Sequence, residues 1–142
     1  MRKAKVITVG IQKGGCGKTT TTCVLGYLLS QEEFGSHRVL VIDMDAQGNS
    51  TELLTQQDMY TFSQRTILEA IKEKNAEPYI VTVTDNLHLL PANDLLALLP
   101  QWIYTTYRSN PNQLISWTIE GIKDKYDFIL IDTPPHLGEA TS

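Results

Sequence analysis

The sequence contains no apolar run long enough to span a membrane, and its first residues lack the apolar core of a secretory signal. It holds only two cysteines, Cys16 and Cys23, which lie seven positions apart with no histidine near them. This spacing fits neither a metal site nor a C-x-x-C redox pair, so we expect two reduced thiols. These absences predict a cytoplasmic protein without a disulfide framework.

An excess of positive charge is also missing. The 142 residues include 12 Lys and Arg against 16 Asp and Glu, which gives a formal net charge of −4. This balance excludes a chain that binds polyanions over its whole surface. The three histidines, His37, His88 and His136, have no partners at metal-ligand spacing and are interpreted as surface or turn residues. The length and the 42% hydrophobic content suffice for one domain, residues 1–142, with a real core.

Short apolar runs rich in Val and Ile are typical of strands that are buried on both faces. Three clear runs are Ala4–Gly10, Arg38–Asp43 and Tyr126–Asp132, with a weaker strand at Leu87–Pro91 and a candidate edge strand at Tyr79–Asp85. Helical patterns lie between them at Lys18–Ser30, Thr66–Lys74, Asn93–Leu99 and Asn112–Lys123. Gly26 is expected to let the first helix approach its neighbours closely, and Pro100 is expected to start a new turn. The alternation predicts a doubly wound α/β domain with a mostly parallel sheet and helices on both faces.

A glycine-rich loop, "IQKGGCGKTT" at Ile11–Thr20, follows the first predicted strand and leads into the first predicted helix. Its end matches the phosphate-binding pattern G-x-x-x-x-G-K-[ST], although Gln12 replaces the first glycine and Lys13 adds a second lysine. Glycines let backbone N–H groups approach phosphate oxygens, and the helix N-terminus adds positive potential. A glycine-rich turn without a ligand is the alternative, and the strand–loop–helix context disfavours it. The predicted cofactor-binding residues are Gly14, Gly15, Cys16, Gly17, Lys18, Thr19 and Thr20.

Two stretches that contain aspartate lie at the ends of the other clear strands, "DMDAQGNS" at Asp43–Ser50 and "ILIDTPP" at Ile129–Pro135. Either stretch alone could be an ordinary turn. However, all three stretches fall at the C-terminal ends of predicted parallel strands, which is the edge where open α/β sheets bind ligands. We therefore expect Asp132 to act as a partner of Mg²⁺ through water. Asp43 and Asp45 are expected to have different jobs, one facing the metal and the other the attacking water.

The segments "KGGCGKTT", "VLVIDMDAQGN" and "DFILIDTPP" closely resemble the deviant Walker A, Walker A′ and Walker B motifs of the ParA/Soj family of chromosome- and plasmid-partitioning ATPases. The resemblance runs from Lys5 to about Leu137, and "LHLLPAN" resembles a segment that these proteins carry between the second and third motifs. MinD and the nitrogenase iron protein share the first motif, but "QGN" and "DTPP" resemble ParA more closely. The resemblance implies a P-loop NTPase that uses ATP and Mg²⁺.

The resemblance also implies a role for individual residues. Lys13 resembles the signature lysine that reaches the phosphates of the partner subunit across an ATP-bound dimer, and Lys18 resembles the phosphate lysine of the same chain. Thr19 would ligate Mg²⁺ directly, with Asp43 and Asp132 as outer-sphere partners. Asp45 resembles the residue that positions the hydrolytic water. Ala46 and Cys16 stand where proline and valine are usual, which implies altered loop stiffness.

Members of this family run well past the third motif, so the resemblance implies an N-terminal portion of a longer domain. The remaining part would supply adenine contacts, much of the dimer surface and a basic surface that binds DNA non-specifically. The implied protein is a nucleoid-associated partition ATPase that forms a homodimer on ATP and is stimulated by a ParB-like centromere-binding protein. Two alternatives remain: a MinD-like positioning ATPase with an amphipathic membrane anchor, and a truncated nucleotide-binding module without turnover.

Overall fold

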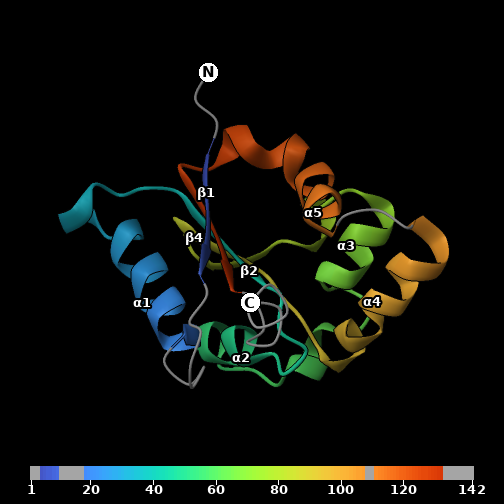
Figure 1. Cartoon of the computed structure of the whole chain (residues 1–142). Coiled ribbons are helices and arrows are strands. Elements are labelled where there is room, and N and C mark those ends of the chain that lie inside the picture. Colours follow the sequence, from blue (N-terminus) through green and yellow to red (C-terminus); the bar gives the residue numbers. More distant parts are fainter. Residues whose placement is uncertain (1–3, 10–17, 108–110, 133–142) are drawn as a thin grey trace.

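The computed structural model describes residues 4–9, 18–107 and 111–132, and within them the strands form one mostly parallel sheet (Figure 1). The sheet order is β1-β5-β2-β4-β3, in which β3 alone runs antiparallel to its neighbour. The strands are β1 (Lys5–Val9), β2 (Val39–Asp43), β3 (Val81–Thr84), β4 (Leu87–Leu90) and β5 (Phe128–Asp132). The expected doubly wound architecture is confirmed, and the candidate edge strand is indeed the antiparallel edge.

Helices cover both faces of this sheet (Figure 1). The α-helices are α1 (Lys18–Ser30), α2 (Asn49–Thr55), α3 (Ile67–Glu73), α4 (Leu99–Trp102) and α5 (Pro111–Ile119). Short 3₁₀ segments are η1 (Glu32–Phe34), η2 (Met59–Phe62), η3 (Glu77–Tyr79), η4 (Asp94–Leu98) and η6 (Glu120–Lys125), and η5 (Ile103–Tyr107) is a π-helical turn. In Figure 1, α1 lies on one side of the sheet and α3, α4 and α5 lie on the other.

The sequence of strand β2 is continuously apolar up to Asp43 because the strand is buried on both faces of the sheet. All of its residues are buried, and they alternate between two core clusters. Val39 and Val41 join the cluster that Leu25 and Leu29 of α1 cover, whereas Leu40 and Ile42 join the larger cluster beneath α3 and α5. A strand covered on both faces has no polar face, so the period-two alternation disappears.

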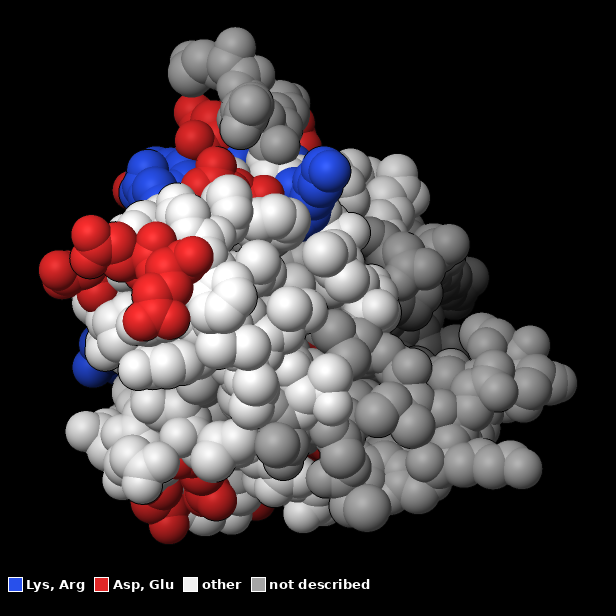
Figure 2. Space-filling view, turned by 90° about the vertical axis from the view of Figure 1, so that its left-hand side faces the viewer, with Lys and Arg blue, Asp and Glu red and all other residues white. Residues whose placement is uncertain are grey.

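Gly26 lets α1 lie close to the sheet, as the sequence predicts. A Cβ atom at this position would stand 3.1 Å from Val41 Cγ2 and 3.3 Å from Leu87 Cδ1. The opposite side of α1 faces outward with Val24 and Tyr27 about half exposed. Figure 2 views this side of the molecule and shows a broad area without charged side chains, with acidic and basic groups at its margins.

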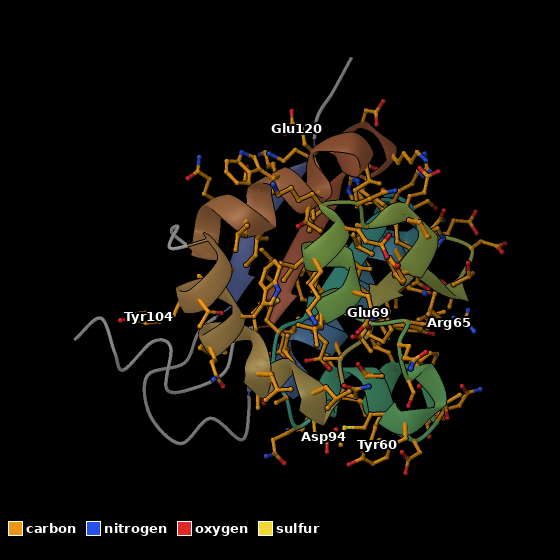
Figure 3. All side chains as sticks on the ribbon, turned by 90° about the vertical axis from the view of Figure 1, so that its right-hand side faces the viewer. Tyr60, Arg65, Glu69, Asp94, Tyr104 and Glu120 are labelled. Carbon is orange, nitrogen blue, oxygen red and sulfur yellow. The ribbon has the colours of Figure 1, made fainter. Side chains whose placement is uncertain are left out.

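The layer on the other face is fixed by local caps. Thr66 and Glu69 form a capping box at the start of α3, in which Glu69 Oε1 accepts the Thr66 N–H at 2.8 Å. The Tyr60 hydroxyl donates to Asp94 Oδ2 at 3.0 Å and thereby joins η2 to η4. Figure 3 shows Tyr60 and Asp94 next to each other, below Glu69.

Two expected helices differ from the structure. The helix expected at Asn93–Leu99 is a 3₁₀ segment, η4, capped by Asn93, and α4 begins only at Leu99. Pro100 lies in the first turn of α4, where no N–H is required. The helix expected to reach Lys123 changes to 3₁₀ geometry after Ile119. Helix α2 is absent from the sequence-based prediction. The 3₁₀ segments and α2 are too short to show a helical apolar period.

Candidate functional site

The C-terminal ends of three parallel strands meet at one edge of the sheet. In the observed register, Val9 of β1 pairs with Asp132 of β5, and Asp132 pairs with Asp43 of β2. The predicted phosphate loop, Ile11–Thr20, follows β1 in the sequence, and its last three residues begin α1 at Lys18. In Figure 1 the strands β1 and β2 run toward the end of the molecule that holds α2 and the start of α1. The ends of the three strands that lead into the predicted stretches therefore share one edge.

Asp43 is fully buried at this edge and accepts hydrogen bonds on both carboxylate oxygens. Its Oδ1 accepts the Asp45 N–H at 3.0 Å, and its Oδ2 accepts the Thr51 N–H at 2.9 Å and the Thr51 hydroxyl at 2.8 Å. Burial raises the pKa of Asp43 from 3.8 to about 7, with a further increase from the nearby Asp132 charge. The bonds from Thr51 and Asp45 oppose this increase and are outweighed by it.

Asp132 lies beside Asp43 and is also fully buried. Its Oδ2 accepts a hydrogen bond from the hydroxyl of Ser50, and its backbone carbonyl accepts the Met44 N–H at 2.8 Å. The second bond extends the β2–β5 pairing past Asp43. Two buried carboxylates on adjacent strands are costly to stability unless they are paired or bind a cation.

Asp45 lies in the turn between β2 and α2. It is 8% exposed, its Oδ1 accepts the Gln47 N–H at 3.0 Å, and its carbonyl accepts the Gly48 N–H at 2.9 Å. The turn interpretation of this stretch is therefore correct as local geometry. Asp43 and Asp45 accept hydrogen bonds from different groups, and their different roles stay a prediction.

Helix α2 was missed from the sequence, and it contributes two buried hydroxyl residues, Ser50 and Thr51, to the site. Gly48 starts the helix with φ 66°, and a Cβ there would stand 2.7 Å from Met59 Sδ and 3.2 Å from the Ala92 carbonyl oxygen. The available signal was Gly-Asn-Ser-Thr at positions 48–51, shortly after the acidic pair, because a glycine and small polar residues favour a helix start.

The other predicted residues fall partly outside the described residues. Lys13, Gly14, Gly15, Cys16 and Gly17 are in the segment 10–17, which the structure does not describe. Lys18, Thr19 and Thr20 form the first turn of α1, and only their backbone is described.

The described carboxylates have the chemistry of ligands for Mg²⁺. Among residues 4–9, 18–107 and 111–132, no group of three or more His, Cys, Asp or Glu side chains could by itself hold a metal ion. Mg²⁺ commonly keeps several waters and binds through one or two carboxylates and substrate phosphates. Asp43 and Asp132 are two adjacent buried carboxylates, as binding of Mg²⁺ through two carboxylates and substrate phosphates requires.

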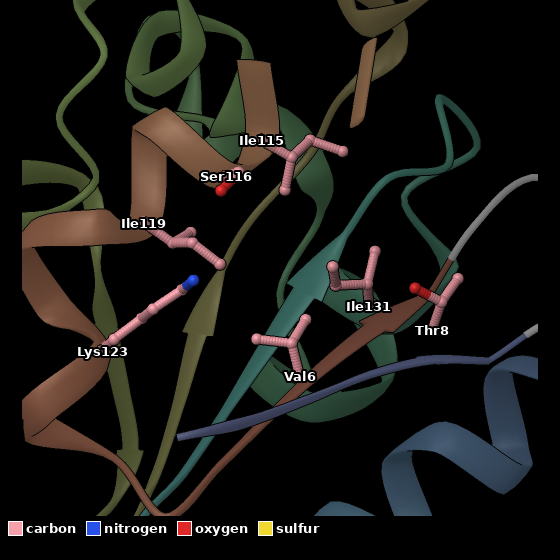
Figure 4. Close-up of a pocket in the computed structure, with 7 residues that line it drawn as sticks. All are labelled: Val6, Thr8, Ile115, Ser116, Ile119, Lys123 and Ile131. Carbon is pink, nitrogen blue, oxygen red and sulfur yellow. The ribbon is translucent and has the colours of Figure 1, made fainter. Parts of the chain in front are cut away.

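A separate cavity of about 270 Å³ lies between the sheet and α5 (Figure 4). It includes none of the residues predicted for the site, and its lining residues are Val6, Thr8, Ile115, Ser116, Ile119, Lys123 and Ile131. Lys123, one of the lining residues, pairs with Glu120 at 3.6 Å. The described helices include none that is long and apolar enough to cross a membrane.

The expectation that all three histidines are surface or turn residues is wrong for His88. Rather than lying in a turn or on the surface, it is half-buried on β4, and its Nδ1 is 2.7 Å from the Tyr126 hydroxyl. Burial lowers the pKa of His88 and raises that of Tyr126 to about 12.

The sheet, the strand–loop–helix order after β1 and the acidic strand ends define an α/β domain of the P-loop NTPase class. A family model described as AAA domain, AAA_31, matches residues 4–142, and the chain belongs to this family. The chain is similar to the sporulation initiation inhibitor protein Soj of Bacillus subtilis, with 33% identity over 96% of this chain and 52% of Soj. It is 36% identical to a ParA family protein of Chlamydia pneumoniae, over 94% of this chain and 51% of that protein.

Solved structures of similar fold agree with these sequence matches. A plasmid partition protein from Borrelia burgdorferi matches with a TM-score of 0.76 and 31% identity, over 94% of this chain and 57% of that one. Cobyrinic acid a,c-diamide synthase from Mycobacterium smegmatis, with a bound ATP analogue and magnesium, matches with a TM-score of 0.82 and 29% identity, over 97% of this chain and 53% of that one. These matches confirm the resemblance to the ParA/Soj family. The chain spans about half the length of the curated relatives it matches.

Proposed function

We propose that this chain binds ATP with Mg²⁺ as the nucleotide-binding part of a ParA/Soj-like partition ATPase. The observation that carries the proposal is the strand register, in which Val9, Asp132 and Asp43 lie side by side. The predicted phosphate loop follows Val9 in the sequence, and at this strand end two buried carboxylates could neutralise a hydrated cation. A bound ATP analogue and magnesium in the similar Mycobacterium smegmatis synthase support the choice of ligand.

Each predicted residue has a distinct role in this proposal. The backbone of the glycine-rich loop would cradle the phosphates, Lys18 would neutralise them, and Thr19 would ligate Mg²⁺. Asp43 and Asp132 would hold Mg²⁺ through its waters, and Asp45 would orient the attacking water. Because phosphoryl transfer depends mainly on positioning and charge neutralisation, a lysine supplied by a second subunit could strongly accelerate it.

That lysine is Lys13, so we propose that the complete site forms only in an ATP-dependent homodimer. The dimer would bind DNA non-specifically, and a ParB-like protein would stimulate hydrolysis during segregation of a plasmid or chromosome. The similarity to Soj and to a plasmid partition protein supports this choice over a MinD-like protein. Binding to lipid vesicles that requires ATP would instead support the MinD-like alternative.

Calorimetry with a non-hydrolysable ATP analogue and Mg²⁺, combined with a phosphate-release assay, tests the proposal. We expect saturable binding that Lys18→Ala abolishes. Lys5→Ala is the matched control, because Lys5 lies at the opposite end of β1 from the site. Binding without phosphate release would identify a nucleotide-binding module rather than an active ATPase. If Lys13→Ala leaves both ATP-dependent dimerisation and hydrolysis unchanged, the role of Lys13 in a second subunit's site is wrong.

A further inference from the structure

Two hydroxyl residues at the start of α2 hold the two carboxylates of the site. We infer that Thr51 and Ser50 are positioning residues, which orient Asp43 and Asp132 toward the Mg²⁺–nucleotide; the inference rests on the proposed function and concerns the same site. Neither residue belongs to the predicted set of site residues, and both are fully buried.

The hydrogen-bond directions at Thr51 can be assigned from chemistry. The Ala92 N–H donates to Thr51 Oγ1 at 2.9 Å, because a backbone N–H can only donate a hydrogen bond. The single hydroxyl hydrogen of Thr51 is therefore available for Asp43 Oδ2, which lies 2.8 Å away. With the Thr51 N–H also on Oδ2 and the Asp45 N–H on Oδ1, both oxygens of Asp43 are held.

This arrangement connects three elements that lie far apart in the sequence. Asp43 ends β2, Thr51 lies on α2, and Ala92 follows β4 within the "LHLLPAN" segment. A change in the position of any one of them would alter the direction of the Asp43 carboxylate. The contact also gives this segment a physical connection to the site.

Ser50 makes the equivalent contact on the neighbouring strand. Its hydroxyl donates to Asp132 Oδ2, and both groups are buried. Because Ser50 and Thr51 are consecutive, the first turn of α2 contacts the ends of β5 and β2 together. The first turn of α2 therefore sets the orientation of both carboxylates.

A purely structural role in starting α2 would not require the hydroxyl groups of Ser50 and Thr51. Asp43 already caps α2 by accepting the Thr51 N–H, and Gly48 provides the start of the helix without a side-chain cap. The two hydroxyl bonds instead reach carboxylates that are costly to bury. Partners that orient ligands at metal sites commonly change metal affinity by tenfold to 100-fold when they are removed.

The test measures the Mg²⁺ concentration that gives half-maximal binding of a fluorescent, non-hydrolysable ATP analogue to the chain. Ser50→Ala and Thr51→Val remove the hydroxyls, and Thr51→Ser keeps one. Thr55→Val is the matched control, because Thr55 Oγ1 donates to the Thr51 carbonyl on the same helix, at 2.6 Å, and not to a carboxylate. Analogue binding in EDTA and circular dichroism are recorded for each variant.

We expect Ser50→Ala and Thr51→Val to raise the required Mg²⁺ concentration roughly tenfold or more, with unchanged binding in EDTA. Thr51→Ser and Thr55→Val should behave like the wild type. Equal Mg²⁺ requirements in all folded variants would overturn the inference, and so would loss of folding in both hydroxyl-deleted variants, which indicates a structural role. If the wild-type chain binds no analogue at any Mg²⁺ concentration, the proposed function itself fails and the inference fails with it.

Discussion

The buried Asp43 carboxyl should make the stability of the chain depend on pH in an unusual direction. Burial raises its pKa from 3.8 to about 7, so between these values the folded chain keeps a proton that the unfolded chain has lost. Folding then takes up a proton, and the free energy of unfolding decreases as pH rises. At about 1.4 kcal/mol for each pKa unit, the total decrease is on the order of 4 kcal/mol, and it ends once the pH exceeds about 7.

Asp43→Asn removes this titration. Because the sequence pI is about 5.3, the measurement is best made between about pH 6 and about pH 8, where the chain is away from its isoelectric point. Over that interval we expect the stability of the wild type to fall by about 1 kcal/mol relative to Asp43→Asn, measured by urea unfolding. Asp124→Asn, at an exposed position, is the control.

The comparison between variants matters more than either curve, since other groups titrate in both proteins. Asparagine keeps one acceptor oxygen, so it can retain the bonds from Thr51 while it loses the bond from Asp45. This loss shifts the whole curve without changing its slope. Parallel stability curves for the wild type and Asp43→Asn would refute the raised pKa of the buried Asp43 carboxyl.

Three further predictions concern the fold. Gly26→Val should destabilise the chain by about 2 kcal/mol through overpacking of α1 against the sheet, and unchanged urea unfolding would contradict that close approach. Thr66→Ala should cost about 1 kcal/mol through loss of the capping box of α3, and an equal midpoint would show that the cap contributes nothing. Since burial lowers the pKa of His88, the chain should lose stability as pH falls below 6.5, and His88→Gln should lose less; an NMR titration that places this pKa at or above 6.5 would exclude the effect.

Much of the fold could be predicted because the central strands carry a strong local signal. Val39–Asp43 and Phe128–Asp132 are apolar runs that end in aspartate, and the structure places them next to each other in the sheet. The helical pattern at Thr66–Lys74 likewise predicted α3, whose cap at Thr66 the structure adds. Such elements can be predicted because the spacing of their apolar residues indicates which of their faces are buried.

The carboxylate part of the site could be predicted, but its surroundings could not. Asp43 and Asp132 were identified from their position after apolar strands, whereas Ser50 and Thr51 were missed. A seven-residue helix such as α2 has no apolar period to reveal it. Its contacts with Asp132 and Ala92 join positions 82 and 41 residues apart, and such distant pairs have no local sequence signal.

A crystal structure of the chain with a non-hydrolysable ATP analogue and Mg²⁺ would test the central claim most directly. We expect the phosphates to contact the loop at residues 10–17, with Mg²⁺ between them and the Asp43 and Asp132 carboxylates and separated from both by water. An analogue bound elsewhere, for example in the cavity beneath α5, or a metal remote from both carboxylates, would contradict it.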